Sequence, residues 1–379
     1  MRGPPEPLTA RDLLRRFLAP AVFVALVFSV YFRAQDGPAD GESATRADGV
    51  RETVRSPGHE RDVVLLEGGT MGTTFSVKVV GTLDAAAQQA LAETVDAELE
   101  QVISQMSTWI PDSELSRFNA HASTTPFPVS SATSTVVDQA AQVFAMTEGA
   151  FDPTVGPLVR AWGFGGGQAP AAALSADEID SLRAHMGMHQ VEVDLAASVI
   201  TKQDPAVELD LSAIAKGWGV DRVHAAVVGL GHEDVMVEIG GEVRVSGRNA
   251  RGARWRLGIE RPDASRGVIH QVVQLDGDAM ATSGDYRNYV ERDGQRWSHT
   301  IDPRTGRPIT HGLASVTVLA DDCTTADAWA TALNVLGPKD GPEIADSKGI
   351  KAYFIIRDAD GFTPLQSAAM AASDRLSDD

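Results

Sequence analysis

Hydrophobic residues recur along this chain at two spacings, and each spacing predicts a different kind of element. Residues 84–106 have a helical composition, with apolar side chains mostly three or four positions apart. These apolar positions are Leu91, Val95, Leu99, Val102 and Ile103. Three further helices are predicted, from Ser130 to Glu148, from Ser212 to about Val228, and near Asp327–Leu336.

Short stretches rich in β-branched residues, bounded by turn residues, predict strands. The predicted strands are Val63–Glu67, Thr73–Val80, Val191–Val193, Val235–Ile239, Val243–Ser246, Trp255–Ile259, Val268–Leu275, Ser315–Leu319 and Ala352–Ile356. A turn is expected at Gly68-Gly69, directly after the first strand. Because many short strands follow the first helices, we predict an α+β fold. It would be one large domain, residues 61–366, with a mainly antiparallel sheet and flanking helices.

The N-terminus has the pattern of an export signal, a positively charged segment followed by an apolar one. The apolar run extends from Phe17 to Phe32, slightly less than the roughly 20 residues that span a bilayer. The preceding arginines are Arg11, Arg15 and Arg16. We predict that residues 1–32 are an uncleaved signal anchor in the inner membrane, with the rest of the chain on the periplasmic or extracytoplasmic side. A signal peptide cleaved near Ala34 and a buried core helix are the alternatives.

The two flanks of the predicted domain lack periodic hydrophobic residues. Residues 33–60 are polar and rich in Gly, Ala, Arg, Asp and Glu, which predicts a disordered tether. Residues 367–379 are acidic and are expected to be frayed. The folded part is therefore predicted to begin close to Val63.

Charge and cysteine content exclude several classes of protein. The formal net charge of −19, with no basic stripe, excludes a nucleic-acid-binding surface. The only cysteine, Cys323, excludes both a CxxC zinc site and an internal disulfide. An acidic protein that binds an anionic substrate such as a pyrophosphate needs a local cation. No G-x-x-x-x-G-K-[ST] loop or strand-placed G-x-G-x-x-G is present, so any nucleotide must be bound in another way.

The first candidate for chemistry is the segment Asp210–Gly219. Asp210 or Ser212 can cap the helix that follows, and Lys216 then lies in its first turn, where backbone amides favour an anion. Gly217 and Gly219 would each cost a helix about 1 kcal/mol relative to alanine, which indicates that something approaches closely. The alternative is a capped helix packed on a sheet with a solvated lysine.

The second candidate is a pair of oxygen ligands on one helix face. Asp327 and Thr331 are four residues apart, so in a helix they lie on the same side. A carboxylate and a hydroxyl are hard ligands of the kind that Mg²⁺ prefers. A polar helix face, with Asp327 stabilising the N-terminus, is the alternative.

Three other segments add candidates of weaker specificity. His299 lies just before a turn marked by Pro303 and Gly306, where it can act as a general base or bind a phosphate, or be structural. Trp109 and Phe151 can sandwich an aromatic ring, although such residues also occur in cores.

Taken together and in order, these segments resemble the ApbE family of flavin transferases, from about Gly68 to Gly337. The matching segments are Met71-Gly72-Thr73, Ser107-Thr108-Trp109, Phe151-Asp152-Pro153, Asp210 to Gly217, Gly240-Gly241-Glu242, Thr282-Ser283-Gly284, His299 to Gly306 and Ala326 to Thr331. Trp109 stands where tyrosine is common in the family, which keeps ring stacking and loses a phenolic hydrogen bond.

The resemblance implies an FAD site without a Rossmann fold, and a Mg²⁺ ion beside it. By motif position, FAD would be lined by Met71, Trp109, Ala150, Phe151, Asp152, Asp210, Lys216 and Ile301. The metal would meet the backbone carbonyl of Ala213, the carboxylate of Asp327 and the hydroxyl of Thr331. His299 and Asp327 are the catalytic candidates, with His299 taking the proton of the attacking hydroxyl.

The resemblance also implies the reaction and the partner. FMN would pass from FAD to a Thr or Ser of an exported or membrane flavoprotein through a phosphodiester, with release of AMP. The acceptor would be a subunit of a membrane electron-transport complex, with a segment such as D-G-x-[ST]-x-A-T. The alternatives are an exported flavoprotein that binds or hydrolyses FAD, and a non-catalytic maturation partner of a respiratory complex.

Overall fold

The structure is a computed structural model that describes residues 52–54, 61–165, 172–262, 268–284, 289–292, 295–359 and 361–377. The predicted signal anchor and most of the predicted tether lie outside these residues. Among the described residues, no helix combines the length and the apolar composition needed to cross a membrane.

The core of the fold is a nine-stranded sheet in which every neighbouring pair of strands is antiparallel. Its strands, in spatial order, are β1 (Glu52–Val54), β2 (Val63–Thr70), β3 (Thr73–Val80), β7 (Val235–Ile239), β8 (Glu242–Ser246), β11 (Ala279–Gly284), β16 (Leu313–Ala320), β17 (Lys351–Asp358) and β18 (Gly361–Gln366). The predicted α+β fold with a mainly antiparallel sheet is confirmed.

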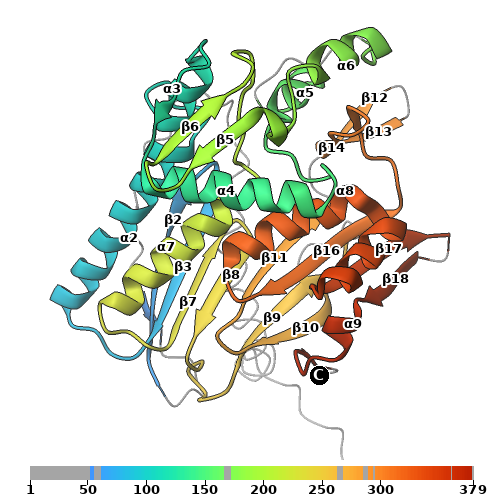
Figure 1. Cartoon of the computed structure of the whole chain (residues 1–379). Coiled ribbons are helices and arrows are strands. Elements are labelled where there is room, and N and C mark those ends of the chain that lie inside the picture. The colour runs from blue at the N-terminus through green and yellow to red at the C-terminus, as the bar shows by residue number, and fades with distance from the viewer. Residues whose placement is uncertain are drawn as a thin grey trace, which may run out of the picture. The chain divides into compact units, whose positions relative to one another are not determined.

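Alternating side chains give the sheet two different faces. In β7, Val235, Val237 and Ile239 are buried with residues of the helices, whereas Met236 is buried in a separate cluster on the other face. The first face is covered by α2 (Ala85–Met106), α7 (Ala215–Gly229) and α8 (Cys323–Lys348), which lie across the sheet in Figure 1. The second cluster includes residues of β9 (Trp255–Glu260) and β10 (Ile269–Leu275). These two strands form a three-stranded sheet with β19 (Leu376–Ser377).

A second group of elements lies beyond one end of these helices, at the top of Figure 1. Its helices are α3 (Glu114–Ala120), α4 (Ser131–Met146), α5 (Gly156–Ala161), α6 (Ala176–Arg183) and the 3₁₀ helix η1 (Met188–Gln190). Its strands are β4 (Phe127–Pro128), β5 (Val191–Asp194), β6 (Val199–Lys202), β12 (Tyr289–Arg292), β13 (Gln295–Ser298), β14 (Ile301–Asp302) and β15 (Arg307–Pro308). Buried side chains of α4 and α8 belong to one hydrophobic cluster, which joins this group to the main sheet.

The predicted helices are confirmed, and local capping groups set the starts of two of them. Asp84 accepts a hydrogen bond from the Ala87 amide at the start of α2, and Ser130 accepts one from Thr133 at the start of α4. The last predicted helix is longer than expected, because Gly337, with a φ of 77°, joins two helical segments within α8.

Two predictions near the N-terminal strands are wrong. Gly68 and Gly69 continue β2 and pair with β3, and the turn is formed by Met71 and Gly72. Both turn residues have positive φ, which the right-handed twist of a two-residue hairpin favours. Glu52–Val54, placed in the tether, instead forms β1 and pairs with β2.

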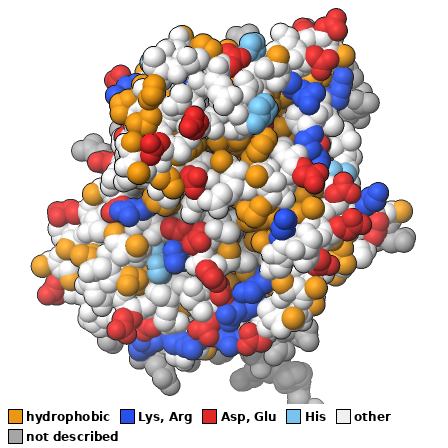
Figure 2. Space-filling view, in the orientation of Figure 1, with side chains coloured by type: hydrophobic (Ala, Val, Ile, Leu, Met, Phe, Trp, Pro, Cys, Tyr) orange, Lys and Arg blue, Asp and Glu red, His pale blue; other side chains and the backbone are white. Residues whose placement is uncertain are grey.

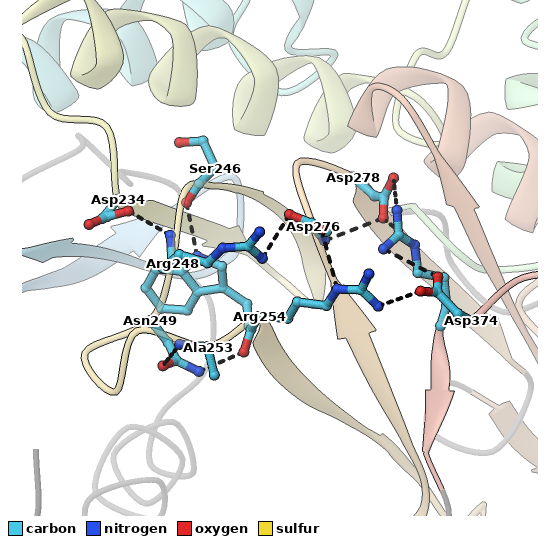
Figure 3. Close-up of polar contacts among 11 residues, drawn as sticks. Asp234, Ser246, Arg248, Asn249, Ala253, Arg254, Asp276, Asp278 and Asp374 are labelled. Carbon is cyan, nitrogen blue, oxygen red and sulfur yellow. Dashed lines mark hydrogen bonds and ion pairs between the residues drawn. The ribbon is translucent and has the colours of Figure 1, made fainter.

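The prediction of a frayed end from residue 367 is also wrong for the described residues. Residues 367–377 form α9 (Ala368–Ala371) and β19, and Met370 is buried in the cluster beneath β9 and β10. Arg375 pairs with Asp278 at 2.8 Å, and Asp374 pairs with Arg254 at 2.7 Å. Figure 3 draws Asp374 and Asp278 within this network of arginines and aspartates. The composition of the tail does not reveal these ion pairs, because the partner residues lie in distant loops.

Candidate functional site

The candidate site is built where the N-termini of α7 and α8 meet. Each helix supplies a carboxylate to the amides of the other, which satisfies donors that have no partner within their own helix. Asp327 of α8 accepts a hydrogen bond from the Gly217 amide at 3.0 Å. Asp221 of α7 accepts hydrogen bonds from the amides of Cys323, at 2.9 Å, and Thr324, at 2.8 Å.

The predicted capping of α7 by Asp210 or Ser212 is wrong. The helix begins at Ala215, and the residue before it, Ile214, provides no side-chain cap. Asp210 accepts a hydrogen bond from the Ser212 amide instead, inside the preceding turn. The cap therefore comes from Asp327, more than a hundred residues later in the chain.

The two glycines of α7 are explained by close approach, as predicted. A Cβ atom at Gly217 would lie 2.3 Å from the carbonyl oxygen of Cys323, at the start of α8. A Cβ atom at Gly219 would lie 3.0 Å from the terminal methyl of Met71. The first glycine lets the two helices touch, and the second makes room for the turn between β2 and β3.

One lysine lies between two buried carboxylates at this junction. The Lys216 ammonium is 2.7 Å from the Glu242 carboxylate and 4.0 Å from that of Asp327. Burial alone would lower the pKa of Lys216, but the two carboxylates outweigh burial and hold its pKa above the ordinary value. Burial raises the pKa of Glu242 and of Asp327, and Lys216 only partly offsets this. The cluster therefore sets two carboxylates against one ammonium, and burial disfavours the charged form of both carboxylates.

A bound cation would favour the charged form of these carboxylates. The Oδ2 atom of Asp327 accepts the Gly217 hydrogen bond, and the Lys216 ammonium lies 4.0 Å from Oδ1. Thr331 follows one turn later on α8, and Ala213 lies just before α7, both partly buried. Among the described residues, no group of three His, Cys, Asp or Glu side chains is arranged to hold a metal. A metal here would therefore need hydroxyl and carbonyl oxygens beside Asp327.

A backbone hydrogen bond holds Asp210 close to the segment Ala150–Asp152. The Asp210 amide donates a hydrogen bond of 2.7 Å to the carbonyl of Pro153. Burial raises the pKa of Asp152, opposed by hydrogen bonds from the amide and hydroxyl of Thr154. These predicted FAD residues therefore lie close together, although they are about sixty residues apart in sequence.

The two aromatic candidates occupy opposite environments. Trp109 lies in the loop after α2 with 72% of its surface exposed, so its ring is available to a ligand. Phe151 is only 2% exposed and packs in the main hydrophobic cluster. The proposed sandwich is therefore wrong for the Phe151 ring, and a ligand contact from this residue would come from its backbone.

The segment from His299 to Gly306 connects the upper elements to α8. Ile301 is buried with Leu158 and Trp162, and the Trp162 indole donates a hydrogen bond of 2.8 Å to the Gly306 carbonyl. The Thr300 hydroxyl lies 3.5 Å from the side-chain nitrogen of Asn334. Asn334 follows Asp327 by two helical turns. His299 itself is partly buried next to this contact.

The structure adds three site residues that sequence reasoning did not single out: Glu242, Asp221 and Asn334. Glu242 ends the Gly240-Gly241 turn and alternates along β8 with buried Val243. Its place in the Gly240-Gly241-Glu242 segment, which is shared with the ApbE family, was the available signal for it. Asp221 and Asn334 had no such signal, because an acid or amide within a helix usually faces solvent.

A pH effect is expected from the buried His224 of α7. Burial, and to a lesser extent the Arg244 guanidinium, lowers the pKa of its imidazole to about 4. In the unfolded chain the imidazole binds a proton near pH 6.5, whereas in the folded protein it does so only near pH 4. The stability of the fold is therefore unaffected by protonation of His224 above about pH 6.5, and it falls as pH drops below this value. Between pH 6.5 and 5, His224→Leu should remove about 1–2 kcal/mol of the pH dependence. Urea unfolding at both pH values measures it, and an unchanged difference in the variant would contradict this account.

Known proteins resemble this chain over most of its described part. The sequence model of the ApbE family matches residues 71–354. A Vibrio cholerae protein named FAD:protein FMN transferase is 44% identical over 306 residues, covering 81% of this chain and 91% of that protein. An Escherichia coli protein of the same name is 39% identical over 311 residues, covering 82% and 88%.

Solved structures agree with these relatives. The flavin transferase ApbE from Vibrio cholerae superposes with a TM-score of 0.75 at 42% identity, covering 82% of this chain and 99% of that one. The apo form of Pseudomonas stutzeri flavinyl transferase ApbE gives a TM-score of 0.75 at 40% identity, covering 82% and 96%. Because the family model spans most of the chain and the fold agrees, the chain belongs to the ApbE family.

Proposed function

We propose that this protein is a Mg²⁺-dependent FAD:protein FMN transferase that attaches FMN to a Thr or Ser of another protein. The observation that carries the proposal is the buried cluster of Lys216, Glu242 and Asp327 at the meeting point of two helix N-termini. The names of its relatives agree with it. A pyrophosphate needs positive charge in an acidic protein, and at this junction Lys216, helix N-termini and a bound Mg²⁺ would supply it.

The described residues support separate roles for Lys216, the metal ligands and the other residues that would contact FAD. Lys216 would lie against the pyrophosphate of FAD, while Ala213, Asp327 and Thr331 would hold Mg²⁺. When bound, Mg²⁺ would supply positive charge that stabilises the phosphoryl oxygens during bond breaking. Met71, Ala150, Asp152, Asp210 and Ile301 would contact the rest of FAD. On the face drawn in Figure 2, hydrophobic side chains gather where the upper elements meet the region of α8, which suits a flat aromatic substrate.

The reaction is a displacement at phosphorus. The acceptor hydroxyl would attack the phosphorus attached to riboflavin, forming a new P–O bond and losing its proton to His299. The bond to the bridging pyrophosphate oxygen breaks, and AMP leaves with that oxygen. FMN remains on the acceptor as a phosphodiester.

The partner and the location are part of the proposal. The arginine-flanked apolar run near the N-terminus supports an anchor in the inner membrane, with the catalytic domain outside the cytoplasm. The acceptor would then be a flavoprotein subunit of a membrane electron-transport complex.

The test uses the full-length chain in detergent with FAD, Mg²⁺ and an acceptor domain that carries a D-G-x-[ST]-x-A-T segment. The acceptor should gain the mass of one FMN, and EDTA should prevent the gain. Release of FMN and AMP without an adduct would favour an FAD hydrolase. Bound FAD without turnover would favour a flavin-binding protein.

The exposed Trp109 makes a separate prediction about FAD binding. Trp109→Ala should raise the KM for FAD about 3- to 10-fold with little change in kcat, because stacking stabilises the bound ring. The neighbouring and less exposed Ile110 provides the control, since Ile110→Ala should leave KM unchanged. Equal KM values for both variants and the wild type would remove Trp109 from the site.

A further inference from the structure

Asp221 is the most heavily bonded carboxylate at the junction of α7 and α8. Its Oδ1 accepts from the Cys323 amide at 2.9 Å and from Arg244 at 2.6 Å. Its Oδ2 accepts from the Thr324 amide at 2.8 Å and from the Thr324 hydroxyl at 2.6 Å. Both oxygens are therefore saturated, and Asp221 has no lone pair left for a substrate or a metal.

These contacts hold the first turn of α8, and Thr324 in that turn lies three residues before Asp327. Residues three apart in a helix lie on neighbouring parts of one face, so the position of Thr324 determines where the Asp327 carboxylate points. Asp327 in turn accepts the hydrogen bond of Gly217, on the same helix as Asp221. The two helices are thus clamped at two points by reciprocal caps.

The strand β8 ties both clamps to the sheet. Glu242 and Arg244 alternate with buried valines, so both face the helices, where Glu242 pairs with Lys216 and Arg244 with Asp221. Two strand residues advance about 6.8 Å, and the five residues from Lys216 to Asp221 advance about 7.5 Å along α7. The similar spacing lets two ion pairs form side by side between the strand and the helix.

We propose that Asp221, held by Arg244, is a positioning residue that sets the Asp327 carboxylate in place relative to Lys216 for metal and FAD binding. The inference rests on the proposed function, because it concerns the same site. Groups that hold a metal ligand in place commonly alter metal affinity 10- to 100-fold when they are removed.

The experiment compares Asp221→Asn with the wild type in the full-length protein, using Mn²⁺ as a spectroscopic probe for Mg²⁺. Free Mn²⁺ measured by electron paramagnetic resonance should give a Kd that is about 10- to 100-fold higher in the variant. The Mg²⁺ concentration for half-maximal FMN transfer should rise by a similar factor. The transfer rate of the variant should therefore be closer to the wild-type rate at saturating Mg²⁺ than at low Mg²⁺.

Asp278→Asn is the matched control, because Asp278 is also buried and paired with an arginine, Arg375, but has none of the contacts with α7 or α8 described here. It should lower the thermal midpoint without changing the Kd for Mn²⁺. Thr324→Val removes only the hydroxyl donor to Asp221 and keeps the side-chain volume. It should weaken Mn²⁺ binding in the same direction by about 2- to 5-fold, as expected for one lost hydrogen bond.

Unchanged Mn²⁺ binding in Asp221→Asn, beside an active wild type, would overturn this inference and leave the proposed function intact. A wild type that neither binds Mn²⁺ nor transfers FMN would overturn both. If Asp221→Asn does not fold, Thr324→Val decides, and wild-type Mn²⁺ affinity in that variant would overturn the inference.

Discussion

Asp327→Asn is expected to lower the rate of FMN transfer by about 10²- to 10³-fold or more, with little loss of stability. The asparagine oxygen can still accept the hydrogen bond of the Gly217 amide, so the cap of α7 is kept. The negative charge that faces Lys216 is lost, and with it the strongest ligand proposed for Mg²⁺. Removing one group that stabilises charge in a transition state commonly has an effect of this size. Intact mass of the acceptor over time measures the rate, and thermal unfolding measures the stability.

A control for this substitution lies on the same helix. Asp322 caps α8 by accepting a hydrogen bond from the Thr325 amide at 2.7 Å. Asparagine caps helices as well as aspartate, so Asp322→Asn should change neither rate nor stability. If Asp327→Asn transferred FMN at the rate of Asp322→Asn, Asp327 would have only a capping role.

Gly217→Ala is expected to cost several kcal/mol of folding free energy and to abolish transfer. The new methyl group would lie 2.3 Å from the carbonyl oxygen of Cys323 and 2.9 Å from the Cβ of Asp327. Backbone atoms cannot rotate away as a side chain can, so α7 and α8 must separate. Overpacking of this kind costs about 1–3 kcal/mol, and more where backbone must move. Urea unfolding gives the free energy, and the transfer assay gives the activity.

The same helix offers the opposite case for comparison. Gly229 is the last residue of α7, and a Cβ atom there would meet nothing within 4 Å. Gly229→Ala should therefore raise stability by up to about 1 kcal/mol, because alanine restricts the unfolded chain. Similar changes in stability for the two variants would mean that helix propensity, and not the contact with α8, governs Gly217.

The arrangement at Gly217 also explains why a small residue and a charged residue are neighbours in this helix. Lys216 needs Glu242 and Asp327 within reach, and these come from β8 and α8. The helix can approach both only if the next residue has no side chain. Gly217 thus permits the close packing of the helix, and Lys216 next to it supplies the charge.

Local sequence patterns were enough to predict most strands of the main sheet and the helices that cover it. The apolar spacing in residues 84–106 and the β-branched run Thr73–Val80 correspond closely to α2 and β3. Each depends on which residues face the core, a property that the period of the sequence carries by itself. Short elements such as α3 and β6 were missed, because a few residues do not show a period.

Sequence alone also identified Asp327, Thr331 and Lys216 as candidates, since their residue types and spacing suit a cation and an anion. It did not determine which atoms meet. Asp327 accepts from the first turn of α7, Asp221 accepts from the first amides of α8, and Glu242 pairs with Lys216. These contacts follow only from the packing of three elements far apart in the chain. Capping donors and buried charges take whatever partner the packed fold brings within hydrogen-bond distance, and that partner is decided by tertiary structure.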